Sequence, residues 1–300
     1  MLFAICNLSF RSVVESAPLR VVATTSDLAS VAGELGGDRV ELQSICPGTQ
    51  DPHFLQAKPT YTLKLRNADL LVSIGLELEK AWLGLLDEGA RNPRILPGQP
   101  GNIEGSKGLE ILEIPAGGVD RSLGDVHPDG NPHYMLDPRN VEVVAKNIAE
   151  RLQSLDGAGS AFYAERLKAF LSRMESARAG WEKKAAGLRG KKVVVYHRDL
   201  IYLARWLGLD IVDAVENIPG VRPSSSHLAD LEGKIKAQGW DLILASAFSD
   251  RAVAQSVAGK TGAALVFLPA APDQGSGIAD EFALFERIIQ NLGEAGHASR

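Results

Sequence analysis

Three histidines in this chain of 300 residues lie in settings that share no local motif. They are His53 in Asp-Pro-His, His133 in Asn-Pro-His-Tyr and His197 in Tyr-His-Arg-Asp. Each lies where the sequence pattern predicts that a strand or a loop passes into a helix. Neutral imidazole is a preferred ligand of zinc and of other transition metals. If the fold brings these side chains together, they form a metal site.

The sequence around the histidines alternates short apolar strands with amphipathic helices. In the first half, strands are predicted at 20–25, 40–45 and 69–75, and helices at 28–35, 59–67 and 78–87. In the second half, strands are predicted at 193–196, 209–215, 242–245 and 264–268, and helices at 199–207, 223–238, 252–261 and 278–292. This alternation favours mainly parallel sheets that are covered by helices.

One long helix is predicted between the two halves, at 160–188, where it would be roughly 43 Å long at 1.5 Å per residue. Residues 97–132 are rich in Gly, Pro and Asp, and we expect a long connection with little regular structure. We therefore predict an α/β fold with two lobes, joined by one long helix, and a metal cleft between the lobes. The expected boundaries are 19–137 for the N-terminal lobe, 138–189 for the helical region and 190–295 for the C-terminal lobe.

The predicted strands also place the histidines relative to this cleft. Ligands of open parallel sheets gather beyond the carboxyl ends of the strands. His197 directly follows a predicted strand, His53 follows another strand through a proline-containing loop, and His133 ends the long connection. We expect His53 and His133 on the first lobe's side of the cleft and His197 on the second's.

Composition excludes several other classes of protein. The chain has 32 basic and 37 acidic residues without a Lys/Arg cluster, so no nucleic-acid partner is expected. No apolar stretch reaches the 18 residues that a membrane span needs. Two cysteines, Cys6 and Cys46, cannot make a four-thiolate metal site. Residues 1–18 are interpreted as the remnant of an export segment, and lipidation of Cys6 is left open.

Several stretches match a known pattern in order along the chain. They are Asp51-Pro52-His53, Lys58-Pro59, Ala68-Asp69-Leu70-Leu71-Val72, Gly75-Leu76-Glu77-Leu78-Glu79, Trp82, Asn131-Pro132-His133-Tyr134-Met135-Leu136-Asp137-Pro138, His197, Tyr202-Leu203-Ala204, Leu207-Gly208-Leu209, Pro219-Gly220 and Pro223-Ser224 before His227. Over about residues 19–293 the chain resembles the periplasmic solute-binding proteins of zinc and manganese ABC importers, the cluster with a rigid interlobe helix.

This resemblance implies that His53, His133 and His197 are metal ligands. In the family, a fourth ligand is usually an Asp in the loop after the last strand, and Asp273 is the only acid there. We therefore predict Asp273 as the fourth ligand, with Asp280, Glu216 and water as alternatives. We interpret His127 as an exposed loop residue, with weak metal capture as the alternative, and His227 as structural.

Three imidazoles with one carboxylate or water suit tetrahedral zinc, whereas manganese prefers more oxygen donors. We expect a monomeric periplasmic or extracytoplasmic protein, not an enzyme, that captures a divalent metal and delivers it to an ABC permease. Zinc is the expected metal, and membrane anchoring of the precursor is left open. The alternatives are a manganese-binding homologue, an adhesin or interaction protein of this fold, and a zinc hydrolase. A hydrolase would have Glu216 as its candidate base, and the chain lacks the His-Glu-x-x-His motif.

Overall fold

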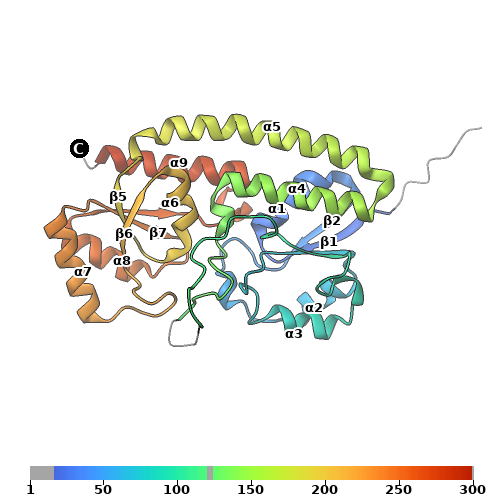
Figure 1. Ribbon diagram of the computed structural model, residues 1–300, viewed down its shortest axis with the longest axis horizontal. Helices are drawn as coiled ribbons and strands as arrows, with labels where there is room; N and C mark the ends of the chain where they lie inside the picture. The colour runs from blue at the N-terminus through green and yellow to red at the C-terminus, as the bar shows by residue number, and fades with distance from the viewer. Residues whose placement is uncertain (1–16, 120–123, 299–300) are drawn as a thin grey trace, which may run out of the picture.

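The computed structural model describes residues 17–119 and 124–298, and it shows two α/β lobes side by side beneath one long helix (Figure 1). This confirms the predicted fold class. Most of the predicted export segment, including Cys6, lies outside the described residues. Among the described helices, none combines the length and the apolar character that crossing a bilayer requires.

The first lobe is built on a parallel sheet with the strand order β2-β1-β3-β4. Its strands are β1 (Leu19–Ala23), β2 (Val40–Ser44), β3 (Leu70–Ser73) and β4 (Asn102–Glu104). All four residues of β3 are buried, as expected for a central strand that is covered on both faces. The described part of segment 97–132 has little regular structure, as predicted, apart from the short strand β4, which pairs in parallel with β3.

The second lobe repeats the same plan, with the parallel order β6-β5-β7-β8. Its strands are β5 (Lys192–Val195), β6 (Asp210–Ala214), β7 (Leu242–Ser246) and β8 (Ala264–Leu268). In each lobe, the second strand along the chain therefore pairs with one side of the first strand, and the third strand pairs with its other side. The carboxyl ends beside such a switch in direction are where ligands bind in open α/β sheets.

Helices cover both faces of both sheets. They are α1 (Ser26–Gly36), α2 (Pro59–Arg66), α3 (Leu83–Ala90), α4 (Pro138–Leu155), α5 (Ser160–Ala185), α6 (Ile201–Leu207), α7 (Ser225–Gln238), α8 (Arg251–Thr261) and α9 (Glu281–Ala298). The long helix α5 ends three residues earlier than predicted, because residues 186–188 form a 3₁₀ turn. Its 26 residues still span roughly 39 Å, enough to lie over both lobes.

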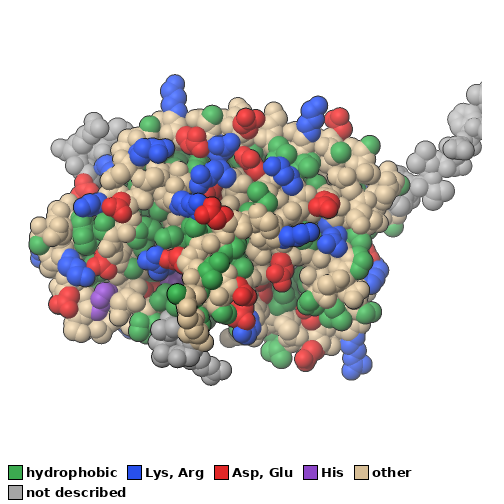
Figure 2. All heavy atoms as spheres, in the orientation of Figure 1, with side chains coloured by type: hydrophobic (Ala, Val, Ile, Leu, Met, Phe, Trp, Pro, Cys, Tyr) green, Lys and Arg blue, Asp and Glu red, His purple; other side chains and the backbone are tan. Residues whose placement is uncertain are grey.

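One apolar core joins the two lobes. It contains Val21 and Val72 from the first sheet, Val193 and Leu244 from the second, and Phe170 from α5. The lower faces of the sheets are packed separately, by α2 and α3 in the first lobe and by α7 and α8 in the second (Figure 1). The lobes therefore share a continuous layer above the sheets and have separate layers below them. The face of the molecule shown in Figure 2 mixes charges of both signs.

The long connection after β4 crosses to the second lobe. The hydroxyl of Tyr202, on α6, accepts a hydrogen bond from Leu112 N (3.0 Å) and donates one to Asn131 O (2.9 Å). Farther along, Asp125 N donates to Pro219 O at 2.8 Å. The connection then enters α4 through an N-cap, because Asp137 accepts from Arg139 N and Pro138 fills the first helical position.

Candidate metal centre

His53 is oriented by the acid two residues before it. The Asp51 carboxylate accepts hydrogen bonds from His53 N (2.9 Å) and from His53 Nδ1 (2.8 Å). Trp82 Nε1 donates to Pro52 O at 2.8 Å and fixes the intervening residue. Because an ionised carboxylate can only accept, the ring proton lies on Nδ1, which leaves a lone pair on Nε2.

His133 is held where the long connection returns to the first lobe. Asn131 Oδ1 accepts from His133 N (3.0 Å), while Asn131 Nδ2 donates to Arg198 O in the second lobe (2.9 Å). Tyr134 follows directly and donates its hydroxyl hydrogen to Ile74 O at 2.8 Å. Burial and the neighbouring imidazoles hold the pKa of His133 well below its usual value, so this ring is neutral at pH 7.

His197 follows β5 and is oriented by an acid from the neighbouring strand. Its Nδ1 donates to Glu216 Oε2 at 2.8 Å, and the same oxygen accepts from Gly220 N at 2.9 Å. Burial lowers the pKa of His197, but the Glu216 hydrogen bond and the charges of Asp199, Glu216 and Asp51 outweigh it and raise the pKa to about 9. Glu216 thus supports a histidine, and its Oε2 is engaged by two hydrogen bonds.

The three predicted histidines lie together. Their ring centroids are 5.1 Å apart for His53 and His133, 5.8 Å for His133 and His197, and 6.3 Å for His53 and His197. Rings bound through one nitrogen to a tetrahedral zinc have centroids roughly 5 Å apart, given zinc–nitrogen bonds of 2.0–2.1 Å. Among the described residues, no three His, Cys, Asp or Glu side chains stand as a preformed metal site. Small rotations of the imidazole rings and a shift of His197 by about 1 Å toward the other two would bring all three into zinc-binding geometry.

A fourth imidazole contacts this group. His127 Nε2 lies 3.2 Å from His53 Nε2, and the two ring centroids are 5.3 Å apart. The side chain is half-buried, so the interpretation of His127 as an exposed loop residue was wrong. No periodic pattern predicts this contact, because it depends on the path of the long connection across the cleft. Burial, then His53, lowers the pKa of His127 to about 4.

The structure does not bring Asp273 to the histidines. Its carboxylate accepts from Ser276 N at 2.8 Å and caps a short 3₁₀ turn. The preceding Pro272 packs on Gly48, where an added Cβ would lie 2.1 Å from Pro272 O. Asp280, the other predicted alternative, caps α9 by accepting from Ala283 N at 2.8 Å. Neither acid lines the cavity that contains His53, His133 and His197.

That cavity has an acidic wall. Among the residues that the structure describes, four carboxylates and no Lys or Arg line it: Asp51, Asp125, Asp199 and Glu216. Asp199 is only 5% exposed, and its Oδ1 has no hydrogen-bond partner. A buried carboxylate oxygen without a partner is costly unless a cation or a proton accompanies it. The wall therefore favours a cation. The sequence pattern marked Asp199 only as the start of the helix predicted at 199–207, so its place in the site was missed.

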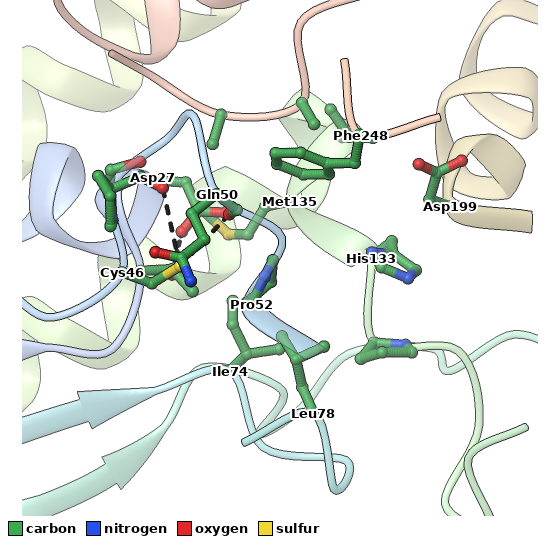
Figure 3. Close-up of a pocket in the computed structure, with 17 residues that line it drawn as sticks. Asp27, Cys46, Gln50, Pro52, Ile74, Leu78, His133, Met135, Asp199 and Phe248 are labelled. Atoms are coloured by element: carbon green, nitrogen blue, oxygen red, sulfur yellow. Dashed lines mark hydrogen bonds between the residues drawn. The ribbon is translucent and has the colours of Figure 1, made fainter. Parts of the chain in front are cut away.

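A second pocket adjoins this cavity and shares His133, Asp199 and Phe248 with it. Figure 3 shows Asp27 and Cys46 at one end of the pocket and His133 and Asp199 at the other. Burial raises the pKa of the Cys46 thiol to about 12, so it stays protonated at neutral pH and is a poor metal ligand.

The predicted structural role of His227 agrees with its contacts, because its Nε2 lies 3.2 Å from Ala214 O and 3.1 Å from Val215 O.

Known proteins match this chain over much of its length. Among curated proteins, the metal ABC transporter substrate-binding lipoprotein ScbA of Streptococcus cristatus is 30% identical over 183 residues, or 60% of this chain and 56% of ScbA. The manganese ABC transporter substrate-binding lipoprotein PsaA of Streptococcus mitis is 31% identical over 160 residues, or 52% of this chain and 48% of PsaA. The chain thus spans about half the length of the curated relatives it matches.

Solved structures share the fold over nearly the whole chain. A ZnuA deletion mutant with zinc bound has a TM-score of 0.76 at 24% identity, covering 93% of this chain and 98% of that one. A Mn-bound periplasmic metal binding protein from Candidatus Liberibacter asiaticus has a TM-score of 0.73 at 18% identity, covering 91% and 98%. The family model described as zinc-uptake complex component A periplasmic matches residues 21–295. The chain therefore belongs to the family of zinc-uptake complex component A periplasmic proteins.

Proposed function

We propose that this protein captures a divalent transition metal ion outside the cytoplasm and delivers it to the membrane permease of an ABC importer. The observation that carries the proposal is the convergence of His53 and His133 from one lobe with His197 from the other. An ion between them would join the lobes. The relatives that are named as ABC transporter substrate-binding lipoproteins support the permease as partner.

Zinc is the ion that the donors favour. The histidines offer nitrogen, and the acids nearest to them, Asp51 and Glu216, are engaged by Nδ1 hydrogens. Such outer carboxylates orient the imidazoles and make them better donors. Manganese is the alternative, supported by the relative named for it, but it prefers oxygen ligands.

A binding role is favoured over hydrolysis. A zinc hydrolase needs a base that is free to take a proton from metal-bound water. Glu216, the candidate base, is occupied by His197 Nδ1 and Gly220 N. An interaction protein of the same fold would need no convergent imidazoles, so metal binding also separates that alternative from ours.

The test is zinc titration of the metal-free full chain, with elemental analysis of the purified protein. We expect about one tightly bound zinc per chain. His133→Ala and His197→Ala should each weaken binding at least roughly a hundredfold, because outer partners of a metal site alone contribute 10–100-fold. His227→Ala removes an imidazole outside the cavity and is the control. No bound zinc, or unchanged affinity in both cavity variants, would contradict the proposal.

A further inference from the structure

His127 lies close enough to His53 for both rings to bind one metal ion. Two nitrogens bound to a tetrahedral zinc at 2.0–2.1 Å are roughly 3.3 Å apart. The two Nε2 atoms are already 3.2 Å apart. His127 lines a cavity with His133 and His197, beside the cavity that contains His53, His133 and His197.

The protonation pattern of this pair suits a shared cation. Asp51 holds the His53 proton on Nδ1, which leaves a lone pair on Nε2. In the metal-free protein, the single N–H of neutral His127 can donate either to that lone pair or to the backbone of Leu76. If both Nε2 atoms are unprotonated, two lone pairs face each other at 3.2 Å, an arrangement that a cation between the rings would stabilise.

Contacts from both lobes hold the segment that carries His127. Its imidazole makes a hydrogen bond with the backbone of Leu76 in the first lobe. Leu76 has a φ of +53°, a left-handed conformation that costs a non-glycine residue free energy. The buried Glu79 supports this turn by accepting from Ile74 N (2.7 Å) and Gly75 N (3.1 Å).

The other attachment is to the second lobe. Asp125 N donates to Pro219 O at 2.8 Å, two residues before His127. An added Cβ on Gly124 would lie 2.1 Å from the same carbonyl oxygen, so the two loops are in direct contact. Residues 124–127, which we call the strap, therefore reach from the second lobe's rim to His53.

We propose that His127 is the fourth ligand of the captured ion, so that four imidazoles hold it and the strap covers the cleft. This inference rests on the proposed function. The predicted carboxylates are committed elsewhere, Asp273 and Asp280 to helical caps and Glu216 to His197. The competing donor is the unpartnered oxygen of Asp199.

Four neutral nitrogens give a site that favours zinc over manganese more strongly than three nitrogens and a carboxylate do. Loss of His127 should therefore weaken zinc binding while changing manganese binding less. A purely structural role of the strap would weaken both metals alike, so the ratio of the two affinities separates ligation from positioning.

The decisive measurement is zinc-edge X-ray absorption of the zinc-loaded full chain, which counts bound imidazoles. We expect four in the wild type and three in His127→Ala and His127→Gln. Zinc affinity should fall at least roughly tenfold in both variants, the lower end of what outer partners contribute. Asp129→Ala changes an exposed acid of the same loop and should leave the count and the affinity unchanged.

Three imidazoles in the wild type, with the same spectrum and affinity in His127→Ala, would overturn this inference while leaving the proposed function intact. If Asp199→Asn instead loses the fourth donor, that position belongs to Asp199 and our assignment fails. If the wild type binds no zinc, or His133→Ala binds it as well as the wild type, the proposed function fails as well.

Discussion

The two lobes share one strand order but present their histidines in different ways. In the first lobe, Asp51 orients His53 from within the same loop, whereas Glu216 reaches His197 from the end of a neighbouring strand. The pKa of His133 lies well below its usual value, whereas that of His197 is raised to about 9. The first lobe thus offers a neutral imidazole, while the second offers an imidazolium. The second lobe must lose a proton before it can bind a metal, so the lobes play unequal parts in capture.

The largest expected effect is on the pH dependence of zinc binding. Because His197 has a raised pKa in the metal-free protein, zinc displaces a proton from it at every pH below about 9. Zinc affinity should rise about tenfold per pH unit between pH 7 and 9 and then level off. Calorimetry in buffers with different ionisation enthalpies should find about one proton released per zinc at pH 7.5. If no proton is released at that pH, His197 is not charged in the metal-free protein, and the proposed difference in charge between the lobes is wrong.

The next effect comes from the two outer carboxylates. Asp51→Asn and Glu216→Gln should each weaken zinc binding at pH 9 by roughly 10–100-fold, because both lose the charge that orients an imidazole. Glu216→Gln should also reduce proton release at pH 7.5, and by more than Asp51→Asn, since Glu216 raises the pKa of His197 through both a hydrogen bond and its charge, whereas Asp51 acts through its charge alone. Equal proton release in the two variants would show that the lobes are electrostatically alike. His227→Gln, outside the cavity, serves as the control.

A smaller effect is expected where the lobes meet. Glu281 at the start of α9 is 1% exposed, and both of its carboxylate oxygens lack a hydrogen-bond partner. Burial, then the charges of Asp27 in the first lobe and of Asp280, raise its pKa well above the usual value. The folded state thus keeps a proton that the unfolded state loses above about pH 4.3, so the free energy of unfolding falls as pH rises from there through the folded pKa.

A Gln side chain cannot ionise, so Glu281→Gln should abolish this fall in the free energy of unfolding with rising pH. At pH 8 we expect the melting temperature of the variant to be a few degrees higher than that of the wild type, and at pH 4.5 we expect little difference. For a chain of this size, a few degrees corresponds to a change in the free energy of unfolding on the order of 1 kcal/mol. Thermal unfolding across this pH range measures it. Glu294→Gln, at an exposed position on the same helix, should have the wild-type profile. A Glu281→Gln profile parallel to the wild type would contradict the raised pKa.

The smallest expected effect is on shape. Because α5 and the joint core tie the lobes together, zinc should change the radius of gyration by less than about 1 Å, in keeping with an approach of His197 by about that distance. X-ray scattering of the metal-free and zinc-loaded chain tests this. A larger contraction would mean that one lobe swings toward the other as a rigid body.

The regular elements could be predicted because their signals are local. Apolar runs such as Val193-Val194-Val195 and caps such as Asp137-Pro138 determine a strand or a helix start within a few residues. The rule that ligands gather at carboxyl ends of parallel strands predicted His53 and His197 at the cleft, and the family resemblance implied that they and His133 bind one metal. That rule needs only the positions of the strands.

The remaining features of the site depend on loop paths, which periodicity does not encode. The contact of His127 with His53 requires the strap to cross the cleft, and β4 becomes a strand only because β3 offers it a free edge. Asp273 was predicted from the family resemblance, which implies an Asp ligand in the loop after the last strand, but the loop that carries it turns toward Gly48. Such outcomes are decided by contacts between segments that are far apart in the sequence.

The apolar core that runs through both lobes also bears on how the protein unfolds. Val72 and Leu244 belong to different sheets, yet they lie in one cluster with Phe170 of α5. Neither lobe can open fully without exposing apolar surface of the other, so heat should unfold the chain in a single cooperative transition. An ion bound in the cleft then stabilises both lobes at once, although each touches it with only a few atoms.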